Sequence, residues 1–165
     1  MIRAITTFGY VGLLRPAPGT WGSAAALVLG LGIDRLFGFP VLVAATLGVT
    51  ILGFWACEQA LRGRPGDDPS EIVIDEVAGQ WIALLFPSAA FWARGVEDWA
   101  LVAYPGWIAA FVFFRLFDIW KPWLVGRADR RGDPAGVMLD DLWAGLFAGL
   151  ATMAAAALAH GVLMS

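Results

Sequence analysis

The fold of this chain follows from its longest internal stretch without a formal charge, residues 36–57, which read LFGFPVLVAATLGVTILGFWAC. A helix needs about 20 mostly apolar residues to cross the hydrocarbon of a bilayer, within a range of about 17 to 25. The charge-free residues 142–165, LWAGLFAGLATMAAAALAHGVLMS, meet the same condition. These two stretches predict helices that cross a membrane.

The composition of the whole chain agrees with this prediction. Of its 165 residues, 59% are hydrophobic and 15% are charged, whereas ordinary soluble domains carry about 25% charged residues. Three more charge-free stretches, residues 16–33, 77–93 and 99–114, are long enough if their ends lie in the head-group layer or inside the bundle. We therefore expect an all-α, polytopic membrane bundle of about five embedded helices, forming a single domain over residues 1–165.

Lysine and arginine predict the orientation of this bundle. With the N-terminus in the cytoplasm, nine of these cations share one side and only Arg35 and Arg94 lie opposite, which follows the positive-inside rule. The nine are Arg3, Arg15, Arg62, Arg64, Arg115, Lys121, Arg127, Arg130 and Arg131. The net charge of −3 carries no information about nucleic acid, but because the basic residues lie in short loops beside the membrane and form no extended face, we expect no nucleic-acid partner.

Two acidic pairs, Asp75-Glu76 and Asp140-Asp141, lie at the starts of apolar stretches on the predicted cytoplasmic side. Charges that persist on membrane helices usually face the protein interior or a hydrated cavity, where they serve a site. A competing interpretation makes each pair a helix cap or a partner of a nearby arginine.

The expected helix starts bear on that choice. Residues 68–71, DPSE, have the pattern of a capping box, which predicts a helix that begins before Asp75 and so leaves Asp75 free for another role. Asp133-Pro134 gives a similar start signal ahead of Asp140.

A third cluster closes the fourth apolar stretch in residues 114–122, FRLFDIWKP. Arg115, Asp118 and Lys121 are three residues apart, so they fan across one side of a helix that Pro122 favours ending. One carboxylate between two cations suits a site that holds both a metal and a phosphate. The same residues also fit a helix C-terminus with favourable cations and an internal salt bridge.

The concentration of acids at one face favours a metal site. Five carboxylates from three helices would repel one another there, and a hard divalent cation relieves the repulsion because Mg²⁺ prefers carboxylate oxygens and substrate phosphates as ligands. The five are Asp75, Glu76, Asp118, Asp140 and Asp141.

Residues 15–23, RPAPGTWGS, form a turn that leads into the first apolar stretch. Thr20 or Ser23 can cap the helix that follows, and exposed amides at its start can bind an anion. Taken alone, this segment also fits a simple loop.

Four motifs together resemble the phosphatidylglycerophosphatase A family, and they occur in the family order over about residues 16–149. They are residues 17–23 (APGTWGS), 75–79 (DEVAG), 114–122 (FRLFDIWKP) and 136–141 (GVMLDD). The resemblance implies a multi-pass enzyme of the bacterial inner membrane with its active site facing the cytoplasm. It would use Mg²⁺ to hydrolyse phosphatidylglycerophosphate to phosphatidylglycerol and phosphate in phospholipid synthesis.

Carried onto matching positions, the resemblance makes the five carboxylates both the catalytic and the metal-binding residues. Arg115, Lys121 and Thr20 would bind the substrate phosphate. The nucleophile is either a water activated by the metal, with one carboxylate as general base, or an aspartate that forms a transient aspartyl phosphate. Both routes, and one or two metal ions, fit the sequence.

Two other functions fit a cluster of acids at a membrane face. Another metal-dependent enzyme of lipid head groups is one, although the signature of the CDP-alcohol phosphotransferases is missing. A non-enzymatic ion-binding or transport protein is the other, although its charges should lie near mid-span. Small residues also recur at helical spacing from the acids, at Gly79, Gly145 and Gly149, and such stripes fit close packing either within the chain or across a homodimer.

Overall fold

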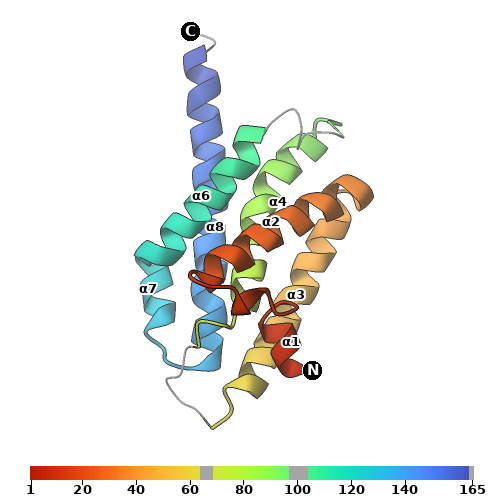
Figure 1. The fold of residues 1–165 in the computed structure, drawn as a ribbon. Helices are drawn as coiled ribbons and strands as arrows, with labels where there is room; N and C mark the ends of the chain where they lie inside the picture. The colour runs from red at the N-terminus through yellow and green to blue at the C-terminus, as the bar shows by residue number, and fades with distance from the viewer. Residues whose placement is uncertain (64–68, 97–103, 164–165) are drawn as a thin grey trace.

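The computed structural model describes residues 1–63, 69–96 and 104–163, and every regular element in these ranges is a helix (Figure 1). This confirms the all-α prediction. The bounds are α1 Ile2–Thr6, a 3-10 turn η1 Val11–Leu13, α2 Pro18–Phe37, α3 Phe39–Ala60, α4 Ile74–Trp92, α6 Tyr104–Trp120, α7 Leu124–Asp129 and α8 Pro134–Leu163.

The long helices α2, α3, α4, α6 and α8 correspond in order to the five apolar stretches. By length and composition, two segments of the described chain are able to cross a membrane, Phe39–Ala60 and Pro134–Ala159. Two such helices are weak support for embedding, since the core helix of a soluble protein can pass the same test. The expected count of about five spans therefore stays a prediction for α2, α4 and α6.

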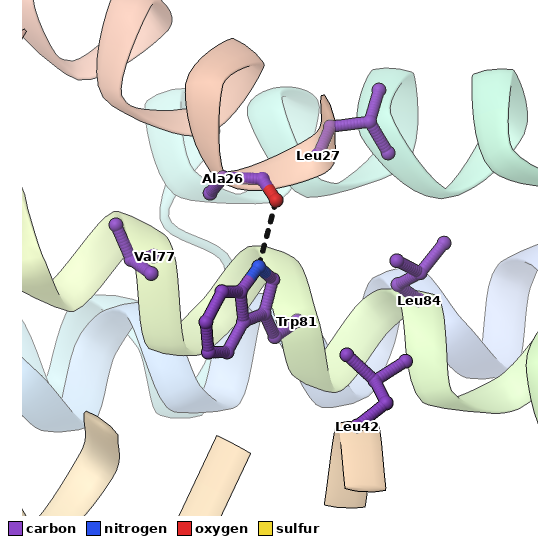
Figure 2. Close-up of a cluster of buried hydrophobic side chains, with 6 residues drawn as sticks. All are labelled: Ala26, Leu27, Leu42, Val77, Trp81 and Leu84. Atoms are coloured by element: carbon purple, nitrogen blue, oxygen red, sulfur yellow. Dashed lines mark hydrogen bonds between the residues drawn. The ribbon is translucent and has the colours of Figure 1, made fainter. Parts of the chain in front are cut away.

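Helix α4 lies at the centre and contacts α2, α3, α6 and α8 (Figure 1). Figure 2 shows one of its packing contacts, where the indole N–H of Trp81 donates a 2.7 Å hydrogen bond to the carbonyl oxygen of Ala26 on α2. Leu42 of α3 and Leu84 of α4 are fully buried in the same cluster. The indole thus fills the core while its polar atom finds a backbone partner, as buried tryptophan requires.

Glycines allow α4 and α8 to approach closely. A Cβ atom added to Gly145 would collide with the backbone of Gly79, and one added to Gly149 would collide with the ring of Phe86. The predicted stripe of small residues is therefore used within the chain, in the manner of close helix contacts in membranes. A homodimer stays a prediction, and it would need another face.

The capping box expected at residues 68–71 was wrong as the start of α4, although the helix does begin before Asp75. Pro69–Ile72 forms a turn, closed by a 2.9 Å hydrogen bond from the Ile72 N–H to the Pro69 carbonyl, and the helix begins at Ile74 without a side-chain cap. Asp68 lies outside the described residues. The N–H of Val73 donates to the carbonyl of Thr6, and Ile72 and Val73 are buried. Tertiary packing therefore overrides the capping pattern and places Asp75 and Glu76 in the first turn of α4.

The other two helix boundaries agree with expectation. Helix α8 begins at Pro134, and the carboxylate of Asp133 accepts a 2.7 Å hydrogen bond from the N–H of Gly136. Helix α6 ends at Trp120, two residues before Pro122. As a result, α2, α4 and α8 begin at the end of the bundle where α6 finishes (Figure 1).

Candidate active site

A cavity of about 310 Å³ lies where these four helix ends meet. All eight residues predicted for the site line it: Thr20, Asp75, Glu76, Arg115, Asp118, Lys121, Asp140 and Asp141. They come from four helix ends that are far apart in the chain, from Thr20 to Asp141, so only the bundle brings them together. Apolar side chains, including Ile72, Ile119 and Val137, complete the lining.

Three of the carboxylates form a compact group. One oxygen atom from each of Asp75, Glu76 and Asp141 can be chosen so that all three lie within 4.8 Å of one another. Asp75 and Asp141 are buried, with 7% and 3% of their surface exposed. Among the described residues, no hydrogen-bond partner faces Glu76 Oε2 or Asp141 Oδ1.

This arrangement fits a divalent cation. Three clustered carboxylates repel one another, and buried oxygen atoms without partners are costly unless a ligand satisfies them. Oxygen ligands of this kind are the ones that Mg²⁺ prefers. The oxygen atoms of these three carboxylates therefore fit a hard metal ion.

The other two carboxylates are paired with cations. Arg115 Nη1 lies 2.5 Å from Asp118 Oδ2, and Lys121 Nζ lies 2.8 Å from Asp140 Oδ2. Among the described residues, the five predicted acids thus divide into three that form no salt bridge and two that each form one at the cavity wall.

Arg115 is also fixed from the side of α2. Its Nη1 donates a 3.2 Å hydrogen bond to the hydroxyl of Ser23, which in turn donates a 2.7 Å bond to the carbonyl of Gly19. Ser23 is fully buried inside α2, and this helix has no side-chain cap. The expectation that Thr20 or Ser23 caps the helix was therefore wrong, because Ser23 turns inward to orient the guanidinium.

The start of α2 forms the part of the cavity wall beside Glu76 and Arg115. A Cβ atom added to Gly19 would collide with Glu76 Oε1 and lie 3.4 Å from Arg115 Nη1. The N–H groups in the first turn of a helix have no partner within the helix and carry a partial positive charge. Thr20 belongs to this turn and lines the cavity.

Lys121 lies immediately after α6, in a left-handed conformation with φ +51°. Its ammonium group pairs with Asp140 and also with Asp129, the last residue of α7. Partial burial lowers the pKa of Lys121, but hydrogen bonds to Asp129 and Asp140 outweigh burial and raise that pKa above its usual range. Lys121 is therefore a permanent cation near neutral pH.

Two residues of this network, Ser23 and Asp129, were not recognised as site residues from the sequence. Ser23 was read as a cap, although its position in the APGTWGS motif was a usable signal. Asp129 belongs to none of the sequence motifs, and its contact with Lys121 depends on how α7 packs after α6.

Comparison with known proteins places this cavity in a family. The family model for phosphatidylglycerophosphatase A matches residues 4–156, which is most of the chain. The chain belongs to the phosphatidylglycerophosphatase A family. Membership makes it a phosphatase, and it removes the non-enzymatic ion-binding or transport alternative.

Two relatives named phosphatidylglycerophosphatase A support the assignment, and a third similar protein has another name. The chain is 34% identical over 138 residues to phosphatidylglycerophosphatase A of Haemophilus influenzae, covering 83% of this chain and 77% of that protein. It is 35% identical over 136 residues to phosphatidylglycerophosphatase A of Escherichia coli, covering 82% and 72%. It is also 36% identical over 136 residues to a putative phosphatidylinositol-3-phosphatase of Bacteroides thetaiotaomicron, covering 79% and 78%. No solved structure matches the chain.

Proposed function

We propose that this phosphatase hydrolyses phosphatidylglycerophosphate to phosphatidylglycerol and phosphate in the bacterial inner membrane, with Mg²⁺ as its cofactor. The observation that carries the proposal is one cavity lined both by Arg115 and Lys121 and by three clustered carboxylates for which the described residues provide no salt bridge. Phosphoryl transfer needs acidic groups that bind a metal ion and positive groups that bind the phosphate, and this cavity contains both.

Asp75, Glu76 and Asp141 would hold the metal ion. Asp118 and Asp140 already pair with cations, so we place them beside the ion, where their charge keeps Arg115 and Lys121 in the cavity. When bound, Mg²⁺ supplies Lewis-acid polarisation of the phosphoryl group and lowers the pKa of an attacking water.

The substrate phosphate would be bound from two sides. Arg115 is held by Asp118 and Ser23 with its guanidinium at the cavity wall, and charge-assisted hydrogen bonds from arginine are strong and directional. The first-turn amides of α2 near Thr20 face the same space and favour an anion. Lys121 contributes a third positive group at the rim.

Proton transfer would fall to one of the carboxylates with a free oxygen. Glu76 and Asp141 each have a buried oxygen atom that no described side chain satisfies. Either residue can accept the proton of an attacking water as general base. An aspartate nucleophile, Asp75 or Asp141, is the second route, in which the aspartyl phosphate is then hydrolysed.

The distribution of apolar side chains supports embedding in a lipid bilayer. Large apolar residues are more than half exposed on four long helices, while acids and amides are buried inside. The exposed residues include Val28, Leu36, Leu47, Ile51, Val112, Ile119, Leu150 and Leu158. Exposed surface of this extent marks contact with lipid or protein, and a lipid phosphatase so embedded reaches its head group without extracting the acyl chains.

The orientation follows from the helix directions. The described members of the nine-cation set all lie at or near the cavity end of the bundle, whereas Arg35 and Arg94 lie at the opposite end (Figure 1). Arg64 lies outside the described residues. The positive-inside rule then puts the cavity at the cytoplasmic face, where the doubly phosphorylated glycerol head group of the substrate is accessible.

Phosphatidylinositol 3-phosphate is the second candidate substrate. It is suggested by the name of the Bacteroides relative, which is as similar to this chain as the two phosphatidylglycerophosphatases are. Both lipids present a phosphomonoester at the membrane surface, so the same catalytic groups would serve either one.

Phosphate release by the purified protein in detergent tests the proposal. With Mg²⁺, phosphatidylglycerophosphate should release phosphate faster than phosphatidylinositol 3-phosphate or phosphatidic acid, and a chelator should abolish the release. Asp141→Asn should lower kcat by at least about 100-fold, as expected for loss of a metal ligand or base. Glu58→Gln, which neutralises an exposed acid on α3, is the matched control and should retain full activity. No release from phosphatidylglycerophosphate, or full activity of Asp141→Asn, would overturn the proposal.

A further inference from the structure

Lys121 is the cation of the cavity that two carboxylates share. Its Nζ lies 2.8 Å from Asp140 Oδ2 and also contacts Asp129 Oδ1. The two partners differ in environment, because the side chain of Asp140 is 9% exposed and that of Asp129 is 39% exposed. Asp140 lines the cavity, whereas Asp129 approaches the lysine from outside the lining.

The backbone conformation allows the contact between Lys121 and Asp129. Lys121 and Trp123 have φ values of +51° and +43°, a left-handed region that residues other than glycine rarely adopt. These conformations change the direction of the chain after α6, so that α7 lies against Lys121. The backbone of α7 packs closely against the residue itself, since a Cβ atom on Gly126 would collide with the carbonyl of Lys121.

The contact between Lys121 and Asp140, inside the cavity, is the one that substrate would disturb. A phosphate entering the cavity competes with Asp140 for Lys121, and Asp140 stands next to Asp141 of the metal-binding group. An ammonium group has three N–H donors, so Lys121 can contact a phosphate while one donor stays on Asp129. Without Asp129, the long and flexible lysine side chain would have no partner once it left Asp140.

We propose that Asp129 is a positioning residue that holds Lys121 at the cavity rim and keeps it directed at the substrate phosphate. This inference rests on the proposed function, because it assumes that Lys121 binds a phosphate. Asp129 itself does not touch the substrate, and it acts through Lys121 alone.

A double-mutant cycle separates this role from a general structural one. Asp129→Asn should raise KM and the inhibition constant of inorganic phosphate together by about tenfold, with a smaller effect on kcat, in line with loss of one charged contact. Lys121→Met should raise both constants at least as much. In the Lys121→Met background, Asp129→Asn should cause no further change, since residues that act as a unit are not additive.

The controls are Asp129→Glu, which should restore most of the phosphate affinity, and Glu58→Gln, which should leave both constants unchanged. Equal losses from Asp129→Asn with and without Lys121, or wild-type constants in Asp129→Asn, would overturn the inference. These outcomes are distinct from failure of the proposed function, which would show as no phosphate release by the wild-type protein.

Discussion

The Arg115 guanidinium shows how single residues organise the cavity wall. Asp118 holds it from one helical turn away on α6, and the buried hydroxyl of Ser23 holds it from α2. Among the described residues, its Nε has no hydrogen-bond partner. The side chain is therefore fixed at one end, with donor capacity left for a ligand.

Ser23→Ala should reduce catalysis without unfolding the protein. The hydroxyl bond to Arg115 is lost, and removal of one partner from a buried, charged hydrogen bond costs about 1.5 kcal/mol, or about tenfold in kcat/KM. Steady-state phosphate release measures the effect. Thr50→Ala, which removes a similar hydroxyl-to-carbonyl bond within α3, is the control and should retain wild-type kinetics. Equal kinetics for Ser23→Ala and wild type would show that Ser23 does not position Arg115.

The site depends most on the contact between helices α4 and α8. It brings Gly79 against Asp141 and Gly145 against Gly79, so the acids at the starts of the two helices meet. Helices without small residues at the contact stay farther apart. The separation of Asp75, Glu76 and Asp141, the proposed metal ligands, is therefore set by glycines about one turn away from them.

Gly145→Ala should destabilise the protein and weaken the site. The new methyl group would collide with the backbone of Gly79, which cannot turn aside as a side chain can, and overpacking of this kind costs about 1 to 3 kcal/mol. Thermal unfolding in detergent should show a lower Tm, with a parallel rise in the Mg²⁺ concentration needed for activity. Gly48→Ala, where nothing lies within 4 Å of the added atom, should keep or raise the Tm. A stable Gly145→Ala protein would show that the helices can separate freely.

At the scale of the whole molecule, charge and apolar surface are arranged along the bundle axis. The cavity and most cations occupy one end, and exposed apolar side chains cover the long helices between the ends. An arrangement of this kind has one orientation in a bilayer that satisfies both the positive-inside rule and the burial of apolar surface.

Cysteine labelling tests that orientation. Arg62→Cys, at the cavity end, should react with a membrane-impermeant maleimide in inverted vesicles, and Arg94→Cys, at the other end, should react only in right-side-out cells. The native Cys57 is fully buried, so the wild-type protein should give little background. Labelling of both positions from the same side would contradict the predicted topology.

The sequence by itself determined the helical class, the order of the long helices and eight of the residues that line the cavity. Each of these depends on local chemistry: charge-free stretches long enough for helices, Pro122 and Pro134 at helix boundaries, and acids and cations in short motifs. The start of α4 could not be predicted from local sequence, because burial of Ile72 and Val73 against the N-terminal segment outweighs a local capping pattern.

Only the tertiary structure decided how the five acids divide. Asp75, Glu76 and Asp141 form the group without cations because glycines let α4 and α8 meet, whereas Asp118 and Asp140 are drawn to Arg115 and Lys121. The roles of Ser23 and Asp129 also arise from contacts between segments 92 and 8 residues apart. Helical periodicity predicts which residues share a face, but which faces meet depends on the packing of the whole bundle.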